Sequence, residues 1–164
     1  MAIETGSTMP SGTLTKVGPD GPDKIEADAL FKGRTVVLFA VPGAFTPTCH
    51  NSHMPPFVQR ADEFKAKGVD EIAVLAVNDP FVMDEWRKSS DNMGRITFLA
   101  DGSADYTKKL GMELDAAGAG LGTRSKRYVA LIEDGKVRWM GLEDNPGAVT
   151  ESGADMVLAA LDER

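Results

Sequence analysis

Four short apolar segments along the chain predict β-strands. Each segment is nearly continuous in apolar residues and rich in β-branched side chains, a pattern typical of central strands that are covered on both faces. The predicted strands are Arg34–Val41, Glu71–Asn78, Arg95–Asp101 and Arg127–Asp134. The sequence therefore favours a sheet in the middle of the molecule.

Segments with helical periodicity lie between these strands and after them. Phe57–Lys67 and Pro80–Lys88 each gather apolar residues on one face, and Ala154–Leu161 predicts a closing helix. After the fourth strand, the Asp134-Gly135 pair predicts a hairpin. This order predicts an α/β fold, with a mixed central sheet and helices on both faces.

The remaining segments add little to this organisation. The Gly-rich, polar segment Asp115–Lys126 is interpreted as a loop, and no internal repeat is visible. A chain of 164 residues is of the length that usually builds a single core, so residues 1–164 are expected to form one domain.

The net charge and the hydropathy of the chain disfavour nucleic acids and membranes as partners. The formal net charge is −7, which disfavours nonspecific attraction to nucleic acids and to anionic membrane surfaces. No apolar run approaches the roughly 20 residues of a membrane span, and no basic stretch precedes an apolar block near the start. A cytoplasmic location is therefore expected.

The only cysteine, Cys49, lies in the turn and helix start that follow the first predicted strand. The segment "RTVVLFAVPGAFTPTCH" reads as a strand, a Pro-Gly turn and a helix that begins near Thr46 to Thr48. Free N–H groups and the helix dipole at that end favour a reactive thiolate, although an isolated cysteine can also be a small buried core residue. The Thr46 hydroxyl could turn to the sulfur, turn to a bound molecule, or cap the helix. Pro55 and Pro56 are expected to break or kink this helix one turn later.

Thr46 stands where a thioredoxin-type C-x-x-C motif has its first cysteine, so disulfide exchange within the motif is excluded. A Cys-His acyl hydrolase with His53 as base lacks a recognisable third group and oxyanion hole. A metal site of Cys49, His50 and His53 has too few ligands at familiar spacings, so neither a metal nor a cofactor is expected. A thiol-based redox sensor without sustained turnover remains open as an alternative to an enzyme.

The segment "PGAFTPTC" resembles the active-site motif of the peroxiredoxins through the spacing of Pro42, Thr46 and Cys49. The following "HNSHMPPF" is similar to the type-five subfamily, whose motif has a histidine four residues after the cysteine, here His53. The resemblance continues through "LAVNDPFVMDEW", "FLADGSADYTKKLGMELD" and "GLGTRSKRYVALIEDGKV", from about Gly33 to Leu142. It implies a thioredoxin-like fold and a thiol-dependent peroxidase acting on hydrogen peroxide and alkyl hydroperoxides.

Carried over by residue, the resemblance makes Cys49 the peroxidatic cysteine, which becomes a sulfenic acid. Thr46 would hold the peroxide, Pro42 would shield the sulfenic acid, and Arg127 would stabilise the charges on sulfur and leaving oxygen. By sequence alone Arg127 reads as a surface residue, and Arg124 is a second choice for the cation.

The chain departs from the family where His50 replaces a common serine. His50 is interpreted as a solvated helix residue. His53 could hydrogen-bond near the thiol or pack against a partner subunit, and the packing role is favoured. The resemblance also implies a homodimer, with Pro80, Phe81 and residues 117–123 as candidate contacts.

Because Cys49 is the only cysteine, the resolving thiol must come from outside the chain. A Cys49–Cys49 bridge between subunits is disfavoured, since both sulfurs would lie recessed at a helix start. Glutathione with glutaredoxin is the favoured reductant, and thioredoxin is the alternative.

Overall fold

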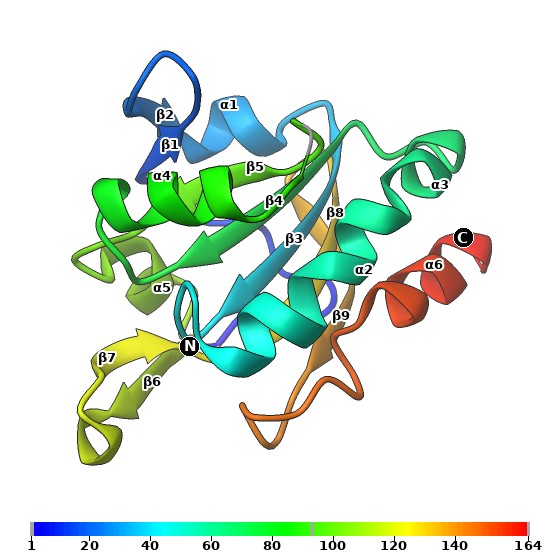
Figure 1. Cartoon of the computed structure of the whole chain (residues 1–164). Coiled ribbons are helices and arrows are strands. Elements are labelled where there is room, and N and C mark those ends of the chain that lie inside the picture. The colour runs from blue at the N-terminus through cyan, green and yellow to red at the C-terminus, as the bar shows by residue number, and fades with distance from the viewer. Residues whose placement is uncertain (1, 93, 164) are drawn as a thin grey trace.

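The computed structural model describes residues 2–92 and 94–163, and its main feature is a seven-stranded mixed sheet (Figure 1). The strand order is β2-β1-β5-β4-β3-β8-β9, in which β3, β4 and β5 run parallel and the other pairs are antiparallel. A separate two-stranded sheet pairs β6 with β7. The strands are β1 (Thr13–Val17), β2 (Asp23–Glu26), β3 (Thr35–Val41), β4 (Glu71–Ala76), β5 (Thr97–Ala100), β6 (Glu113–Ala116), β7 (Gly122–Ser125), β8 (Tyr128–Glu133) and β9 (Lys136–Leu142).

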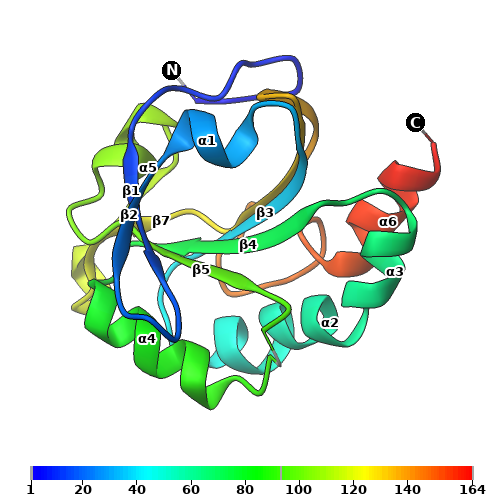
Figure 2. The same ribbon diagram turned by 90° about the horizontal axis from the view of Figure 1, so that it is seen from above.

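Helices cover both faces of the main sheet (Figure 2). One apolar layer joins the sheet to α2, α3, α4 and α6, and the opposite layer joins it to α1 and α5. The helical elements are α1 (Ala27–Phe31), η1 (Cys49–His53), α2 (Met54–Gln59), α3 (Ala61–Ala66), α4 (Pro80–Ser89), α5 (Asp105–Lys109), η2 (Ala117–Ala119) and α6 (Ala154–Asp162). The prediction of a mixed sheet with helices on both faces is confirmed.

Strand β3 shows why the central segments read as continuous apolar runs. Val37, Phe39 and Val41 enter one apolar layer, while Val36 and Leu38 enter the other. Both faces of the strand are therefore buried, and polar residues have no place in its middle. Since β8 pairs antiparallel with β3 and Tyr128 lies opposite Ala40, the chain just before β8 meets the chain just after β3.

Segment Asp115–Lys126 is not the loop that its composition predicts. It forms most of a hairpin in which β6 and β7 are joined by the 3₁₀ turn η2. The hairpin projects from the main sheet (Figure 1) and most of its residues are exposed or half-buried. Its strands are only four residues each and lie in or beside a Gly-rich, polar segment, so sequence reasoning interprets the segment as a loop.

The helix break predicted at Pro55 and Pro56 does not occur, and only a kink remains as a prediction. Pro55 and Pro56 lie in the first turn of α2, which continues directly from η1. Proline removes an N–H donor from a helix interior, and the helix has π geometry over Cys49–His53, directly before the two prolines. The predicted helix Phe57–Lys67 is instead interrupted at Arg60, which separates α2 from α3.

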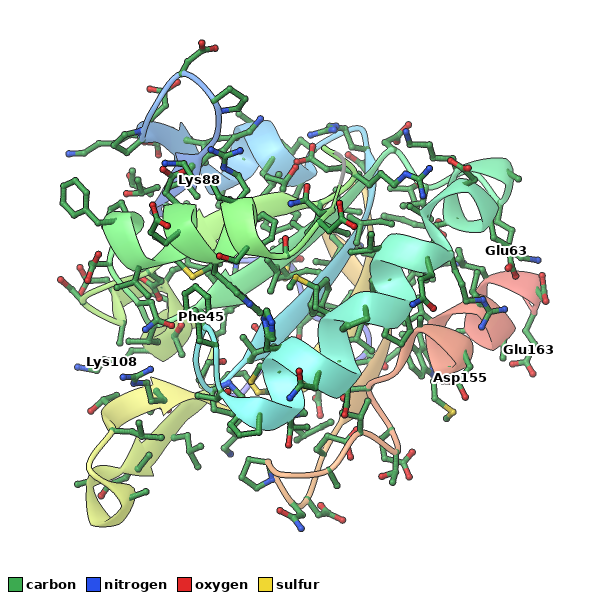
Figure 3. The ribbon with its side chains drawn as sticks, viewed as in Figure 1. Phe45, Glu63, Lys88, Lys108, Asp155 and Glu163 are labelled. Carbon is green, nitrogen blue, oxygen red and sulfur yellow. The ribbon has the colours of Figure 1, made fainter. Side chains whose placement is uncertain are left out.

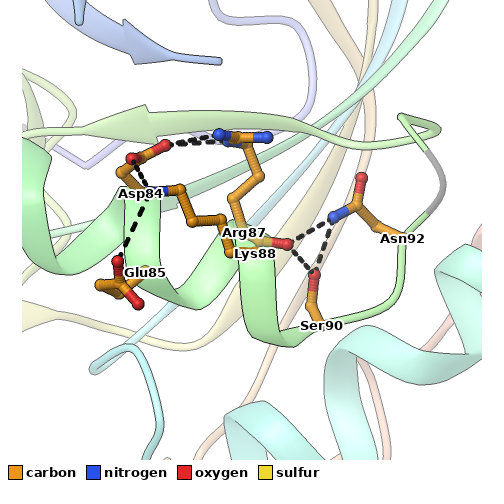
Figure 4. A network of polar contacts seen from close by, with 6 residues as sticks. All are labelled: Asp84, Glu85, Arg87, Lys88, Ser90 and Asn92. Atoms are coloured by element: carbon orange, nitrogen blue, oxygen red, sulfur yellow. Dashed lines mark hydrogen bonds and ion pairs between the residues drawn. The ribbon is translucent and has the colours of Figure 1, made fainter. Parts of the chain in front are cut away.

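Helix α4 packs through Met83 and Trp86 and is capped at its start by Asp79. A network on its outer face joins Arg87 and Lys88 to Asp84, while Asn92 and Ser90 bind the last turn (Figure 4). All of these contacts lie within α4 and the turn that follows it. Among the described residues, no helix is long and apolar enough to cross a membrane.

Candidate active site

The turn after β3 brings the chain tightly back toward the sheet. Ala44 N–H donates to Asn78 Oδ1 at 2.9 Å, and Phe45 has a φ of 63°. A positive φ is unusual for a bulky residue, so tertiary contacts must hold this turn. A Cβ at Gly43 would lie 2.7 Å from Arg124 Nη1 and 3.1 Å from Thr46 Cγ2. A side chain at this position would therefore displace the guanidinium of Arg124.

Cys49 opens a segment of π-helix, Cys49–His53, within a helix that begins at Pro47. Such wide turns are rare and often lie at functional sites. Both Cys49 and His53 are fully buried and contact the same side chain, Arg127. The structure thus confirms the predicted helix start but gives the cysteine an unusual helical geometry.

The Arg127 guanidinium occupies the centre of the site. Its Nη2 donates to Cys49 Sγ at 2.8 Å, its Nη1 to His53 Nδ1 at 2.7 Å, and its Nε to the Pro146 carbonyl at 2.7 Å. Arg127 is only 2% exposed, so it is not the surface residue that local sequence suggests. We call Cys49, His53 and Arg127 the floor of the site.

His53 is held in one neutral tautomer. Arginine has donors only, so Nδ1 of His53 accepts and Nε2 carries the proton, which it donates to the Ser152 carbonyl at 2.9 Å. Burial, and next the Arg127 charge, lower the pKa of His53 from 6.5 to about 4. The favoured prediction that His53 packs against a partner subunit is therefore wrong, because the ring is inside the protein.

His50 points away from the floor. Its Nδ1 accepts a hydrogen bond from Trp86 Nε1 at 3.0 Å, and its ring stacks on Phe45 with centroids 5.8 Å apart. Phe45 lies at the turn before η1 (Figure 3) and is 46% exposed. His50 is half-buried and anchored to α4, rather than the freely solvated residue that the sequence suggests.

A pocket of about 260 Å³ leads to Arg127 and Thr46. The Thr46 hydroxyl donates to the Gly43 carbonyl at 2.7 Å, which leaves its oxygen lone pairs available as acceptors. Apolar residues of the hairpin form one wall, and we call them the mouth: Leu114, Ala116, Ala119 and Leu121. The other lining residues are Pro42, Pro47, Thr48, Pro146 and Gly147.

Pro42 and Arg124 lie at the side of this pocket. Pro42 is buried, and its carbonyl accepts from Arg124 Nη1 at 3.3 Å. Arg124 Nε donates to the Leu121 carbonyl at 2.9 Å. Arg124 therefore ties the hairpin to the turn after β3, whereas Arg127 contacts the sulfur.

The chain matches the Redoxin family model over residues 4–158. It is 48% identical over 162 residues to peroxiredoxin-2C of Oryza sativa subsp. japonica, covering 97% of this chain and 98% of that protein. The chain belongs to the peroxiredoxins. This peroxiredoxin is accordingly a thiol peroxidase.

Solved structures agree with the family and the fold. Reduced Prx3 from Vibrio vulnificus in complex with H2O2 is 46% identical, with a TM-score of 0.91 and 97% and 99% of the two chains covered. Peroxiredoxin 5 from Alvinella pompejana is 34% identical, with a TM-score of 0.86 and 99% of each chain covered. The thioredoxin-like fold is confirmed, and a one-cysteine peroxiredoxin of the type-five kind fits these similarities.

Sequence reasoning missed several residues that complete the site of this peroxiredoxin. Pro146 and Ser152 act through backbone carbonyls, which leave no trace in side-chain identity. Glu143, described further below, follows an exposed strand end and reads as a solvated acid. Three of the mouth residues lie in the Gly-rich segment Asp115–Lys126, and Leu114 directly precedes it, so their sequence reads as a loop.

Proposed function

We propose that this peroxiredoxin reduces hydrogen peroxide and alkyl hydroperoxides at Cys49, using an external thiol to complete each cycle. The observation that carries the proposal is the 2.8 Å contact between Arg127 Nη2 and Cys49 Sγ in a buried setting. Among the described residues, no carboxylate forms an ion pair with Arg127. The guanidinium is therefore available to stabilise a thiolate and a developing oxyanion.

In the first step, the peroxide lies between Thr46 and Arg127. The Cys49 thiolate attacks the terminal oxygen, which keeps its hydrogen and forms the S–O bond of a sulfenic acid. The O–O bond breaks, and its electron pair leaves on the other oxygen as alkoxide or hydroxide. Protonation from solvent gives the alcohol or water.

Arg127 keeps N–H donors that can stabilise the negative charge on the leaving oxygen. Three of its five N–H groups are used by Pro146, His53 and Cys49, so one N–H is left on each of Nη1 and Nη2. The Thr46 oxygen can accept a hydrogen bond from the peroxide OH group. Buried Pro42 would limit water around the new sulfenic acid.

In the second step, an external thiolate attacks the sulfenic sulfur and displaces hydroxide, which takes a proton from solvent to become water and leaves a mixed disulfide. A second thiol then attacks that disulfide and returns Cys49 as thiolate. No other cysteine exists in the chain to replace the external thiol. We favour glutathione with glutaredoxin, and thioredoxin is the alternative reductant.

The peroxide and the reducing thiol need different degrees of access to Cys49. Cys49 is 0% exposed, which suits a small peroxide entering through the pocket but not the thiol of a tripeptide. We therefore expect the segment Cys49–His53 to open before the mixed disulfide forms. The resolving step should then be slower than the reaction with peroxide at equal concentrations.

Two observations support the choice of peroxides. The Vibrio vulnificus relative was solved in complex with H2O2, which supports hydrogen peroxide as a substrate here. The apolar mouth offers a surface to the organic part of an alkyl hydroperoxide. Neither peroxide requires a group beyond the pocket residues and Cys49.

Glutathione use is testable by intact-protein mass spectrometry. After one equivalent of peroxide and excess glutathione, we expect a single glutathione adduct, which the Cys49→Ser variant lacks. Without thiol, excess peroxide should convert Cys49 to sulfinic and sulfonic acids. Rapid reduction by thioredoxin with no glutathione adduct would contradict the proposed reductant and leave the peroxidase assignment intact.

A homodimer and a cytoplasmic location are further parts of the proposal. Phe81 is 78% exposed near the start of α4, and residues 117–123 project on the hairpin, which supports the candidate contacts. Light scattering that gives a monomer mass for both reduced and oxidised protein would contradict the dimer. The compartment requires localisation in cells, since relatives include proteins named chloroplastic.

A further inference from the structure

The loop between β9 and α6 supplies two backbone carbonyls to the floor of the site. Pro146 accepts from Arg127 Nε at 2.7 Å, and Ser152 accepts from His53 Nε2 at 2.9 Å. The same loop accepts a third hydrogen bond, from Thr48 Oγ1 to the Gly147 carbonyl at 3.0 Å. The position of Arg127 therefore depends on the position of residues 144–152.

A single carboxylate holds this loop. Glu143 Oε2 accepts from the backbone N–H groups of Thr150, Glu151 and Ser152 and from Ser152 Oγ at 2.7–2.9 Å, and Oε1 accepts from Thr150 Oγ1 at 2.9 Å. Glu143 is 6% exposed. Although burial opposes ionisation, the hydrogen bonds from Ser152, Glu151 and Thr150 lower the pKa of Glu143 below its ordinary value.

Close packing of the loop on β9 is a separate observation. A Cβ at Gly141 would lie 1.9 Å from the Glu151 carbonyl oxygen and 2.9 Å from its carbon. Any larger residue at this position would push the backbone of the loop away. Glu143 also binds the floor through its own backbone, because its N–H donates to the Arg127 carbonyl at 3.1 Å.

These contacts form a continuous series from Glu143 through Ser152, His53 and Arg127 to Cys49. The members between the carboxylate and the guanidinium are neutral, so Glu143 orders Arg127 without pairing with it. A carboxylate in direct contact with Arg127 would compete with the Cys49 thiolate for the same donors. The arrangement fixes the cation and leaves its charge to the sulfur.

We propose that Glu143 is a positioning residue of the peroxidase reaction, acting through residues 144–152 and His53 on Arg127. This inference rests on the proposed role of Arg127. It predicts that disturbing the loop will slow the chemistry of Cys49, even though Glu143 itself touches neither the sulfur nor the pocket.

The first test is Glu143→Gln, which keeps the shape but places an NH2 group among five donors. We expect the second-order rate constant for peroxide to fall about tenfold. Alkylation of reduced Cys49 by iodoacetamide should slow as well, and the ultraviolet absorbance of its thiolate should decrease. Loss of a nearby negative charge alone would favour the thiolate and speed alkylation, so faster alkylation would overturn the proposal.

The second test is Gly141→Ala, which displaces the loop while Glu143 keeps its charge. Both rates should fall in this variant too. The matched control is Asp101→Asn, because Asp101 is 5% exposed and accepts three hydrogen bonds, from Tyr106 N, Thr107 N and Thr107 Oγ1, without a contact to the floor. It should lose stability but keep both rates.

Equal rates in wild type, Glu143→Gln and Gly141→Ala, with only thermal stability reduced, would make Glu143 a structural clamp and overturn the proposal. If Glu143→Gln does not fold, Gly141→Ala and the milder Ser152→Ala, which removes one hydrogen bond to Glu143, decide the question in the same assays. The Arg127→Met variant, measured in parallel, separates a failure of the role of Glu143 from a failure of the proposed function. Slow chemistry there with normal chemistry in the loop variants contradicts only the role of Glu143, whereas normal chemistry in Arg127→Met contradicts the proposed function itself.

Discussion

The floor of the site is fixed by hydrogen bonds, whereas its mouth consists of apolar side chains on a hairpin outside the main sheet. Cys49, His53 and Arg127 are each at most 2% exposed and contact one another directly. The mouth residues are half-buried or exposed and line the pocket without contacting the sulfur. From this difference we expect the floor to set the chemistry for every peroxide and the mouth to select among peroxides.

The largest effect is expected when the floor loses its cation. Arg127→Met keeps much of the side-chain volume but removes every donor to Cys49, His53 and Pro146. We expect the rate constant to fall about a hundredfold to a thousandfold. Stopped-flow kinetics should show the same factor for hydrogen peroxide and for cumene hydroperoxide. A loss confined to one peroxide would contradict the assigned role of the floor.

His53 offers a second way to test the floor, through stability. The unfolded chain protonates this histidine below about its ordinary pKa of 6.5, whereas the folded protein resists protonation until about 4. The stabilising contribution is therefore fully present above pH 6.5 and is lost as the pH falls toward 4. The maximum loss is about 3 kcal/mol.

The matched variant is His53→Gln, whose amide can accept from Arg127 and donate to Ser152 but does not titrate. Urea unfolding in small pH steps should give a difference between the two proteins that shrinks or reverses from pH 6.5 down to 4. Parallel stability curves over this interval would show that His53 is not held neutral in the folded protein.

The smallest effect is expected at the mouth. Leu121→Ser replaces an apolar lining residue with a small polar one and leaves the floor contacts in place. We expect the rate constant for cumene hydroperoxide to fall about tenfold, while that for hydrogen peroxide stays near the wild-type value. An equal loss for both peroxides in stopped-flow kinetics would remove the distinction between mouth and floor.

The sequence was sufficient to predict the central strands of the sheet and the helix start that carries Cys49. Strands β3, β4, β5 and β8 are visible because both of their faces are buried, and the turn to the Cys49 helix is marked by Pro42 and Gly43. Strands β1 and β2 were not predicted, because "TLTKV" and "DKIE" mix polar and apolar residues; β2 forms the edge of the sheet and β1 lies next to it.

Other parts of the site depend on contacts between distant segments. Arg127 can be buried because His53 and Pro146, which lie 74 and 19 residues away, accept its hydrogen bonds. Only the family resemblance predicted that Arg127 acts on Cys49. Nothing in the sequence distinguishes Glu143 from a solvated acid, because its partners are mainly backbone N–H groups.

Multiple-turnover peroxide consumption tests the central claim most directly. With glutathione and glutaredoxin, or with thioredoxin and its reductase, wild-type protein should consume many equivalents of hydrogen peroxide per chain. The folded Cys49→Ser variant should consume none above background. Consumption that stops after one equivalent of peroxide with every reductant, or turnover that persists in Cys49→Ser, would contradict catalysis through this cysteine.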